Sequence, residues 1–229
     1  MQNPAGSEYD RLFYPFLFDG GKASLEEILA QVRHSTREKC REVVELRRAM
    51  LSSRKEQLLV VSQAMATAFR HGATLFAFGN GGSATDAQDL VADLLNPPLP
   101  HWRSLPALAL TDDIAVITAV GNDIGFDTIF ARQLIAFGKP GDIAVAISTS
   151  GNSSNLLLAL EQAKKQGLLT VGFSGYDGGK MLHSSATDFC LFPPCDFLPR
   201  IQEAQATLYH TLIALVQALL QKEPGESIA

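Results

Sequence analysis

The chain has 229 residues, a length that suits one α/β domain with an extension and allows a sizeable core. Its 46% hydrophobic and 19% charged residues are ordinary for a folded protein, and its net charge of −5 argues against direct nucleic-acid binding. The three cysteines form no CxxC pair, which is typical of a reducing compartment. The sequence has no apolar run of membrane-spanning length and no recognisable secretory signal. Together these features predict a cytoplasmic protein that does not enter a membrane.

The chain begins with a segment rich in aromatic residues. Residues 1–23 carry these aromatics between glycines and prolines, which predicts an irregular strap. From Ser24, an N-cap candidate with Glu27 three residues later, a helical pattern runs to about Leu51, and a second helix is expected from about Lys55 to Arg70. These helices would pack on the domain or on another copy of the chain.

The next stretch is a strand, a glycine turn and a helix. Thr74–Phe78 is short and apolar, Gly79–Ser83 is glycine-rich, and the helix that follows carries Asp86, Asp89 and Asp93 near one face. Such a turn serves chain geometry alone in many proteins, but it also presents N–H groups and a positive dipole end to an anion. A phosphate cradle that leads into an acidic helix favours chemistry on a phosphorylated small molecule.

Apolar runs then alternate with helical patterns. The remaining strands are expected at Ala107–Leu110, Asp142–Ile147, Leu168–Phe173 and Asp188–Phe192. The remaining helices are expected around Asp113–Val120, Asp127–Phe137, Ser153–Gln166 and Phe197–Lys222. This alternation predicts an αβα three-layer sandwich around a five-stranded parallel, flavodoxin-like sheet. Residues 24–222 form a single domain in this interpretation, with a helical extension at its N-terminal end and a tail at 223–229.

A second candidate phosphate site follows the strand that ends at Ile147. Ser148–Ser153 offers four hydroxyl groups, a glycine and an asparagine at the beginning of the next helix. A Ser-rich N-cap region would have the same composition. Because the carboxyl ends of parallel strands lie along one edge of the sheet, we expect this turn and Gly79–Ser83 to be close together.

Five ordered motifs resemble those of the sugar isomerase (SIS) domain family, in particular its phosphoheptose isomerase branch. They are GNGGSxxDAxxxxxxL at Gly79, VGNDxGF at Val120, GDxxxxISTSGNS at Gly141, GxDGGK at Gly175 and RIQE at Arg200. The resemblance runs from about Ser24 to Leu220. It implies the same αβα fold, a homotetramer with sites at subunit interfaces, and the conversion of sedoheptulose 7-phosphate to D-glycero-D-manno-heptose 7-phosphate.

The resemblance also assigns roles to individual residues. It places the base of an enediol isomerisation on Asp93 and the acid/base on His210, although the apolar pattern of the last helix would equally suit a solvated histidine at that position. The substrate-binding positions that it implies are Asn80, Gly81, Gly82, Ser83, Asn122, Asp123, Ser148, Thr149, Ser150, Ser153 and Gln202.

Two positions depart from the family's pattern. Relatives commonly carry histidine where this chain has Asp89 and glutamate where it has Asp93; with Gln202 and His210 these make up the zinc site of the members that bind zinc. Carboxylates in place of imidazole give a harder ligand set, which favours manganese, magnesium or no metal over zinc.

Two functional hypotheses follow. The first is an isomerase of sedoheptulose 7-phosphate or of a related ketose phosphate. The alternative is a non-catalytic protein of this family that binds a sugar phosphate or regulates a partner, similar to the tetrameric partner of the bacterial replication initiator.

Because Asp93 lies ten residues beyond Ser83, a rise of ~15 Å along a helix, the sequence also predicts that a complete site uses two chains.

Overall fold

The computed structural model describes residues 25–222 of the chain. The chain divides into two compact units, residues 1–42 and residues 43–229. In the first unit the described residues are 25–42, the beginning of helix α2. The expected strap at 1–23, the N-cap at Ser24 and the tail at 223–229 lie outside the described residues.

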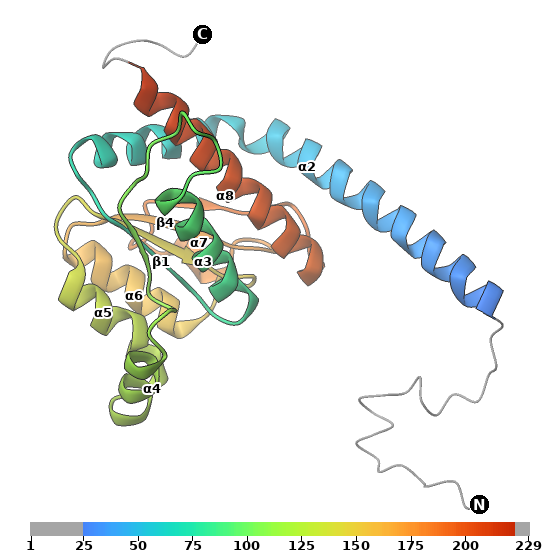
Figure 1. Ribbon diagram of the computed structural model, residues 1–229. Coiled ribbons are helices and arrows are strands. Elements are labelled where there is room, and N and C mark those ends of the chain that lie inside the picture. The colour runs from blue at the N-terminus through green and yellow to red at the C-terminus, as the bar shows by residue number, and fades with distance from the viewer. Residues whose placement is uncertain (1–24, 223–229) are drawn as a thin grey trace, which may run out of the picture. The chain divides into compact units, whose positions relative to one another are not determined.

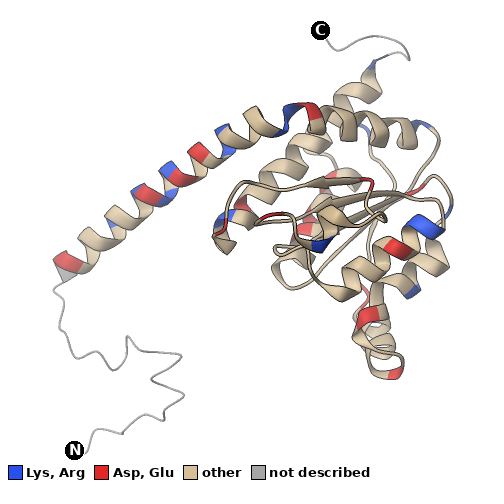
Figure 2. Cartoon of the chain, turned by 180° about the vertical axis from the view of Figure 1, so that it is seen from behind, with Lys and Arg blue, Asp and Glu red and all other residues tan. Residues whose placement is uncertain are grey.

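Helix α2, Leu25–Arg70, is one uninterrupted helix of 46 residues, so the prediction of two helices was wrong. The sequence between Leu51 and Lys55 contains no glycine or proline, and the Ser52 hydroxyl donates to the Arg48 carbonyl within the helix. Charged residues of both signs alternate along this helix (Figure 2), and they include the exposed ion pair of Arg41 and Glu38 at 2.9 Å. Pairs of this spacing support a helix that is exposed to solvent.

The second unit is built on a parallel sheet of five strands in the order β2-β1-β3-β4-β5, which confirms the predicted flavodoxin-like sandwich. The strands are β1 Leu75–Gly79, β2 Ala107–Ala109, β3 Ile143–Ile147, β4 Leu169–Phe173 and β5 Phe189–Leu191. In this order β1 and β3 are neighbours, and Gly79 pairs with Ile147 at their carboxyl ends. The loops after β1 and β3 therefore start side by side.

Helices cover both faces of this sheet (Figure 1). The two faces follow from the alternation of side chains along each strand: Leu75 and Ala77 point to one core, Phe76 and Phe78 to the other. The first core contains the second half of α2 together with α3 and α8, and the second contains α5, α6 and α7. These helices are α3 Gly82–Leu95, α5 Ile129–Phe137, α6 Ser154–Lys165, α7 Gly179–His183 and α8 Leu198–Gln221.

Helix α4, Ile114–Asp123, differs from the others because none of its residues is buried. A short 3-10 helix, η2 (Phe126–Thr128), joins it to α5. Helix α7 was not predicted, because a helix of five residues that itself begins with a glycine has too little periodicity to be recognised. Among residues 25–222 no helix is both long enough and apolar enough to cross a membrane.

Candidate phosphate and acid/base sites

The first turn, Gly79–Ser83, connects β1 to α3. Its shape requires glycine at two places: Gly81 has φ +57°, and a Cβ on Gly79 would lie 2.4 Å from the Ser83 carbonyl oxygen and 2.9 Å from that of Ile147. Backbone hydrogen bonds close the turn, since the Ser83 N–H donates to the Asn80 carbonyl at 3.1 Å. The turn is therefore fixed by the backbone, and Ser83 is buried beneath it.

The second turn, Ser148–Ser153, connects β3 to α6. The Ser148 hydroxyl accepts from the Gly151 N–H at 3.0 Å, and the Ser150 hydroxyl accepts from the Asn152 N–H at 3.2 Å. Gly151 has φ +65°, and a Cβ there would lie 2.3 Å from the Gly178 carbonyl oxygen. This turn therefore depends on close packing against the loop that follows β4.

The two turns enclose one small cavity at the carboxyl edge of the sheet. Asn80 of the first turn and Asn155 at the beginning of α6 form two reciprocal side-chain hydrogen bonds of 2.9 Å. The cavity of about 70 Å³ is lined by four hydroxyl residues, one amide and two aliphatic residues: Ser83, Ser148, Thr149, Ser153, Asn80, Ile147 and Leu156. None of these is acidic, and the N-termini of α3 and α6 begin at the two turns, so the cavity suits an anion such as phosphate.

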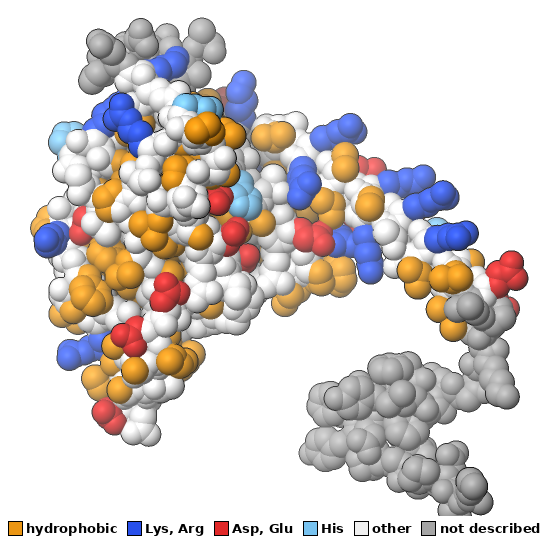
Figure 3. Space-filling view, viewed as in Figure 1, with side chains coloured by type: hydrophobic (Ala, Val, Ile, Leu, Met, Phe, Trp, Pro, Cys, Tyr) orange, Lys and Arg blue, Asp and Glu red, His pale blue; other side chains and the backbone are white. Residues whose placement is uncertain are grey.

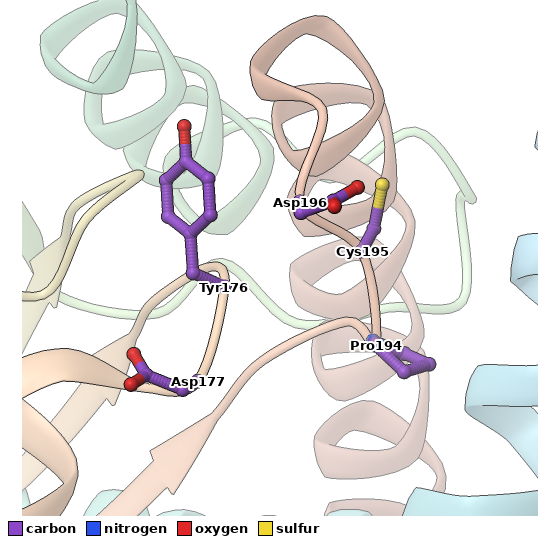
Figure 4. Close-up of a pocket in the computed structure, with 5 residues that line it drawn as sticks. All are labelled: Tyr176, Asp177, Pro194, Cys195 and Asp196. Atoms are coloured by element: carbon purple, nitrogen blue, oxygen red, sulfur yellow. The ribbon is translucent and has the colours of Figure 1, made fainter.

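A larger hollow of about 550 Å³ lies between the loops that follow β4 and β5. Figure 4 shows Tyr176 and Asp177 on one of these loops and Pro194, Cys195 and Asp196 on the other. Two carboxylates in its lining would repel a phosphate group. Electrostatics therefore favours the smaller cavity as a candidate anion site, despite the difference in volume.

A cluster of acid/base side chains lies between α3 and α8. His210 Nε2 is 3.2 Å from Asp89 Oδ2 and 3.4 Å from Asp93 Oδ2. The Tyr209 hydroxyl donates to Asp89 Oδ2 at 2.7 Å, and its ring lies 4.5 Å from the His210 ring. Figure 3 shows acidic and histidine side chains adjoining on this face of the molecule. The spacing of three and four residues on α3 thus places two carboxylates within reach of one imidazole.

Two further groups of this cluster were not assigned a role from the sequence. Burial raises the pKa of Asp86 to about 6; the nearby charge of Asp89 adds to this shift, while His210 opposes it. Asp86 Oδ2 is buried and has no hydrogen-bond partner among the described residues. Burial and the hydrogen bond to Asp89 also raise the pKa of Tyr209 far above its usual range, so the phenol stays protonated. In the sequence, the position of Tyr209 on the apolar stripe of the last helix was the signal that could have indicated a buried hydroxyl beside the cluster.

The other predicted site residues lie in different places. The Gln202 amide rests on the first turn, because a Cβ on Gly82 would be 2.3 Å from Gln202 Nε2. Asn122 donates to Asp123 at 2.8 Å on exposed α4, and neither they nor Ser150 line the cavity. The structure therefore brings together the two turns and Gln202, while the predicted residues on α4 do not line the cavity.

Helix α3 links the phosphate turn to the acid/base cluster without a break from Gly82 to Leu95. Ser83 and Asp93 are ten residues apart on it, which corresponds to ~15 Å of rise. This separation bears on whether one chain can supply a complete site.

Three of the four candidate metal ligands, Asp89, Asp93 and His210, meet between α3 and α8. Asp89 Oδ2 is engaged by the Tyr209 hydroxyl, and the Gln202 amide packs on Gly82. Within the described part of the chain, no group of three or more His, Cys, Asp or Glu side chains is placed to hold a metal ion.

Comparisons with known proteins decide the family. Residues 40–175 match the SIS domain. The chain belongs to the SIS domain family. Its similarity to curated members includes 42% identity to the phosphoheptose isomerase of Aquifex aeolicus over 79% of this chain and 93% of that protein. It is also 43% identical to the phosphoheptose isomerase of a Geobacter species over 84% of this chain and 95% of that protein.

Solved structures of the family agree with this assignment. The phosphoheptose isomerase of Neisseria gonorrhoeae superposes with a TM-score of 0.74 at 30% identity, over 82% of this chain and 99% of that one. The corresponding enzyme of Francisella tularensis gives a TM-score of 0.69 at 32% identity, over 86% of this chain and 99% of that one. The resemblance seen in the five sequence motifs, including its phosphoheptose isomerase branch, is confirmed.

Proposed function

We propose that the protein is an isomerase that converts sedoheptulose 7-phosphate to D-glycero-D-manno-heptose 7-phosphate through an enediol. Similarity to curated phosphoheptose isomerases supports this function. The structural observation that carries it is the position of His210 Nε2, 3.4 Å from Asp93 Oδ2. A carboxylate and an imidazole in this arrangement are the pair that a ketose–aldose isomerisation needs.

The phosphate group would bind in the cavity between the two turns. Ser83, Ser148, Thr149 and Ser153 supply hydroxyl donors there, and the N-termini of α3 and α6 add their positive dipole ends. Gln202, whose amide lies against Gly82 of the first turn, would contact the bound sugar.

The proton transfers can be assigned to two groups. In the proposed reaction Asp93 removes a proton from C1 of the ketose while His210 donates one to the carbonyl oxygen on C2, which gives the enediol. Asp93 then returns a proton to C2, and His210 takes the proton from the oxygen on C1, which gives the aldose. The reaction balances with two protons moved and no oxidant.

We propose that each complete site combines two chains of a homotetramer, with the turns from one chain and the acid/base cluster from another. The ~15 Å between Ser83 and Asp93 along α3 supports this arrangement. Exposed apolar side chains supply surface for association: Ile28, Leu29 and Val32 on α2, and Ile114 on α4.

Mixed assemblies test the two-chain site. Ser153→Asp keeps a good N-cap for α6 but puts a carboxylate in the phosphate cavity, and His210→Ala removes the acid/base. Each variant alone should be inactive, while the two chains refolded together should regain measurable activity. Continued inactivity of a mixed tetramer would show that both parts of the site come from one chain.

The decisive experiment is turnover of sedoheptulose 7-phosphate by the purified protein, with aldose formation followed by NMR. Asp93→Asn and His210→Ala should each lower kcat by roughly 10²–10⁴-fold, the usual contribution of a positioned acid or base. Binding of the substrate to both variants, measured by calorimetry, should persist. A wild-type protein that binds the sugar phosphate without turning it over would instead support the non-catalytic alternative.

A metal arm belongs in the same experiment. Protein treated with a chelator is assayed before and after addition of zinc, manganese or magnesium. Activity that survives the chelator would show that side chains alone carry the proton transfers. Activity that appears only with a metal would mean that Asp89, Asp93, Gln202 and His210 rearrange into a ligand set around the ion.

We expect the enzyme to act in the cytoplasm, where its three free cysteines would stay reduced.

A further inference from the structure

Gln205 on α8 is a buried amide that the proposed chemistry does not use. Its side chain is fully buried, and it lies on the helix that also carries Gln202 and His210. Its Nε2 donates two hydrogen bonds of 2.7 Å, one to the Ser148 carbonyl and one to the Ser174 carbonyl. One amide group thus joins the helix to two separate loops.

Both acceptors stand where a strand ends. Ser148 is the first residue after β3 and opens the second phosphate turn, and Ser174 is the first residue after β4. The Ser174 hydroxyl donates to the Gly178 carbonyl at 3.0 Å, and Gly151 packs against these same two groups. Gln205 therefore holds the phosphate turn and also the loop that supports it.

The Oε1 atom of Gln205 indicates that the need to fill a buried position does not explain why this side chain is an amide. Its Oε1 is buried and has no hydrogen-bond partner among the described residues. A buried acceptor without a partner is unfavourable for stability, and an aliphatic side chain of similar shape would avoid it. The two donated hydrogen bonds are the feature of Gln205 that an aliphatic residue could not supply.

We propose that Gln205 is a positioning residue that holds the second phosphate turn at a fixed position relative to α8. It acts on the substrate through the Ser148 carbonyl and the turn that begins there, and it does not touch the substrate itself. The inference rests on the proposed function only in that the turn binds a phosphate group.

A matched control lies on the same helix. Gln217 is also fully buried, and its amide makes two hydrogen bonds to the backbone of Arg103, at 2.7 and 2.9 Å. Gln205→Met and Gln217→Met each remove one buried amide and two hydrogen bonds from α8. Only the first of these changes concerns the phosphate turn.

The test compares the two variants in thermal unfolding, in binding and in turnover. Both should lower Tm to a similar extent. Gln205→Met should raise the KM for sedoheptulose 7-phosphate and the Kd for inorganic phosphate, measured by ³¹P NMR, about tenfold or more, because small displacements of a binding group have large effects. Gln217→Met should leave both constants within about twofold, since it lies away from the turn.

Equal KM and Kd values in the two variants would overturn the proposal. Gln205→Glu provides a second route if Gln205→Met does not fold: it keeps the shape of the side chain, and its neutral acid can donate one hydrogen bond at low pH. Phosphate affinity should then recover as the pH falls. If neither Gln205 variant folds while Gln217→Met does, Gln205 is a stability residue and the proposal is wrong. Phosphate binding does not depend on turnover, so failure of the isomerase assignment would be seen separately.

Discussion

The phosphate cavity and the acid/base cluster are built in different ways. The cavity is formed by two turns at the carboxyl ends of neighbouring strands, and buried amides, including Asn155 and Gln205, hold these turns in place. The cluster is formed by side chains of two packed helices, and Asp89 and His210 in it are about half exposed. A rigid backbone site is suited to a group that does not change in the reaction, whereas groups that exchange protons need side chains and access to the reacting atoms.

This difference predicts where substitutions act. Changes in the turns should affect folding or substrate affinity, because the backbone of the turns belongs to the core of the domain. Changes in the cluster should affect kcat, as proposed above for Asp93 and His210, because side chains on exposed helix faces contribute little to packing.

The largest effect on the fold is expected from Gly79→Ala. The added Cβ would meet the Ser83 and Ile147 carbonyl oxygens at 2.4 and 2.9 Å, and these are backbone atoms that cannot move aside cheaply. We expect a loss of about 3 kcal/mol in the free energy of unfolding, measured with urea.

Gly121→Ala is the matched control for Gly79→Ala. Gly121 lies within α4, and the nearest atom to an added Cβ is Ile129 Cγ2 at 3.8 Å, an ordinary contact. Because alanine favours a helix over glycine, this variant should be unchanged or more stable by up to about 1 kcal/mol. Equal destabilisation of the two variants would contradict the special role of the turn after β1.

Thr149→Val should separate affinity from chemistry. Valine has nearly the shape of threonine but lacks the hydroxyl that lines the phosphate cavity. KM for sedoheptulose 7-phosphate should rise about tenfold, equivalent to about 1.4 kcal/mol, while kcat changes little. Steady-state kinetics gives both values, and a fall in kcat at unchanged KM would place Thr149 with the cluster instead.

Asp86→Asn should give the smallest effect, and its size should depend on pH. The pKa of Asp86 is raised from 3.8 to about 6, so the folded protein binds this proton more tightly than the unfolded chain does. Stability of the wild type should therefore increase as the pH falls from about 6 to about 4, and above pH 6 the ionised carboxylate destabilises the fold.

Asparagine cannot ionise, so at position 86 it removes the destabilisation that the ionised carboxylate causes above pH 6. We expect Asp86→Asn to be more stable than the wild type at pH 8 by about 1 kcal/mol, less than the full shift would give because the carboxyl group is only half buried. The difference should vanish near pH 4. Thermal unfolding across this pH range measures it, and a variant that is equally destabilised at both pH values would rule out the electrostatic cause.

Patterns along the chain were sufficient to predict the five strands, most of the helices, the sheet class and the two turns. Alternating apolar runs and helical patterns identified all five strands, and glycines and hydroxyl residues marked the turns after β1 and β3. These features are local, because strand and helix periodicity and turn chemistry are properties of a few consecutive residues. The break expected in α2 shows the limit of such patterns, since a short polar stretch without glycine or proline does not end a helix.

Several contacts between distant side chains became visible only in the folded chain. The Tyr209 hydroxyl reaches Asp89 across 120 residues of sequence, and Gln205 reaches Ser148 across 57. The Gln202 amide rests on Gly82 for the same reason: α8 returns to the sheet edge beside α3. Contacts of this kind depend on strand order and on how each helix is rotated against the sheet, and a pattern read along one segment contains neither.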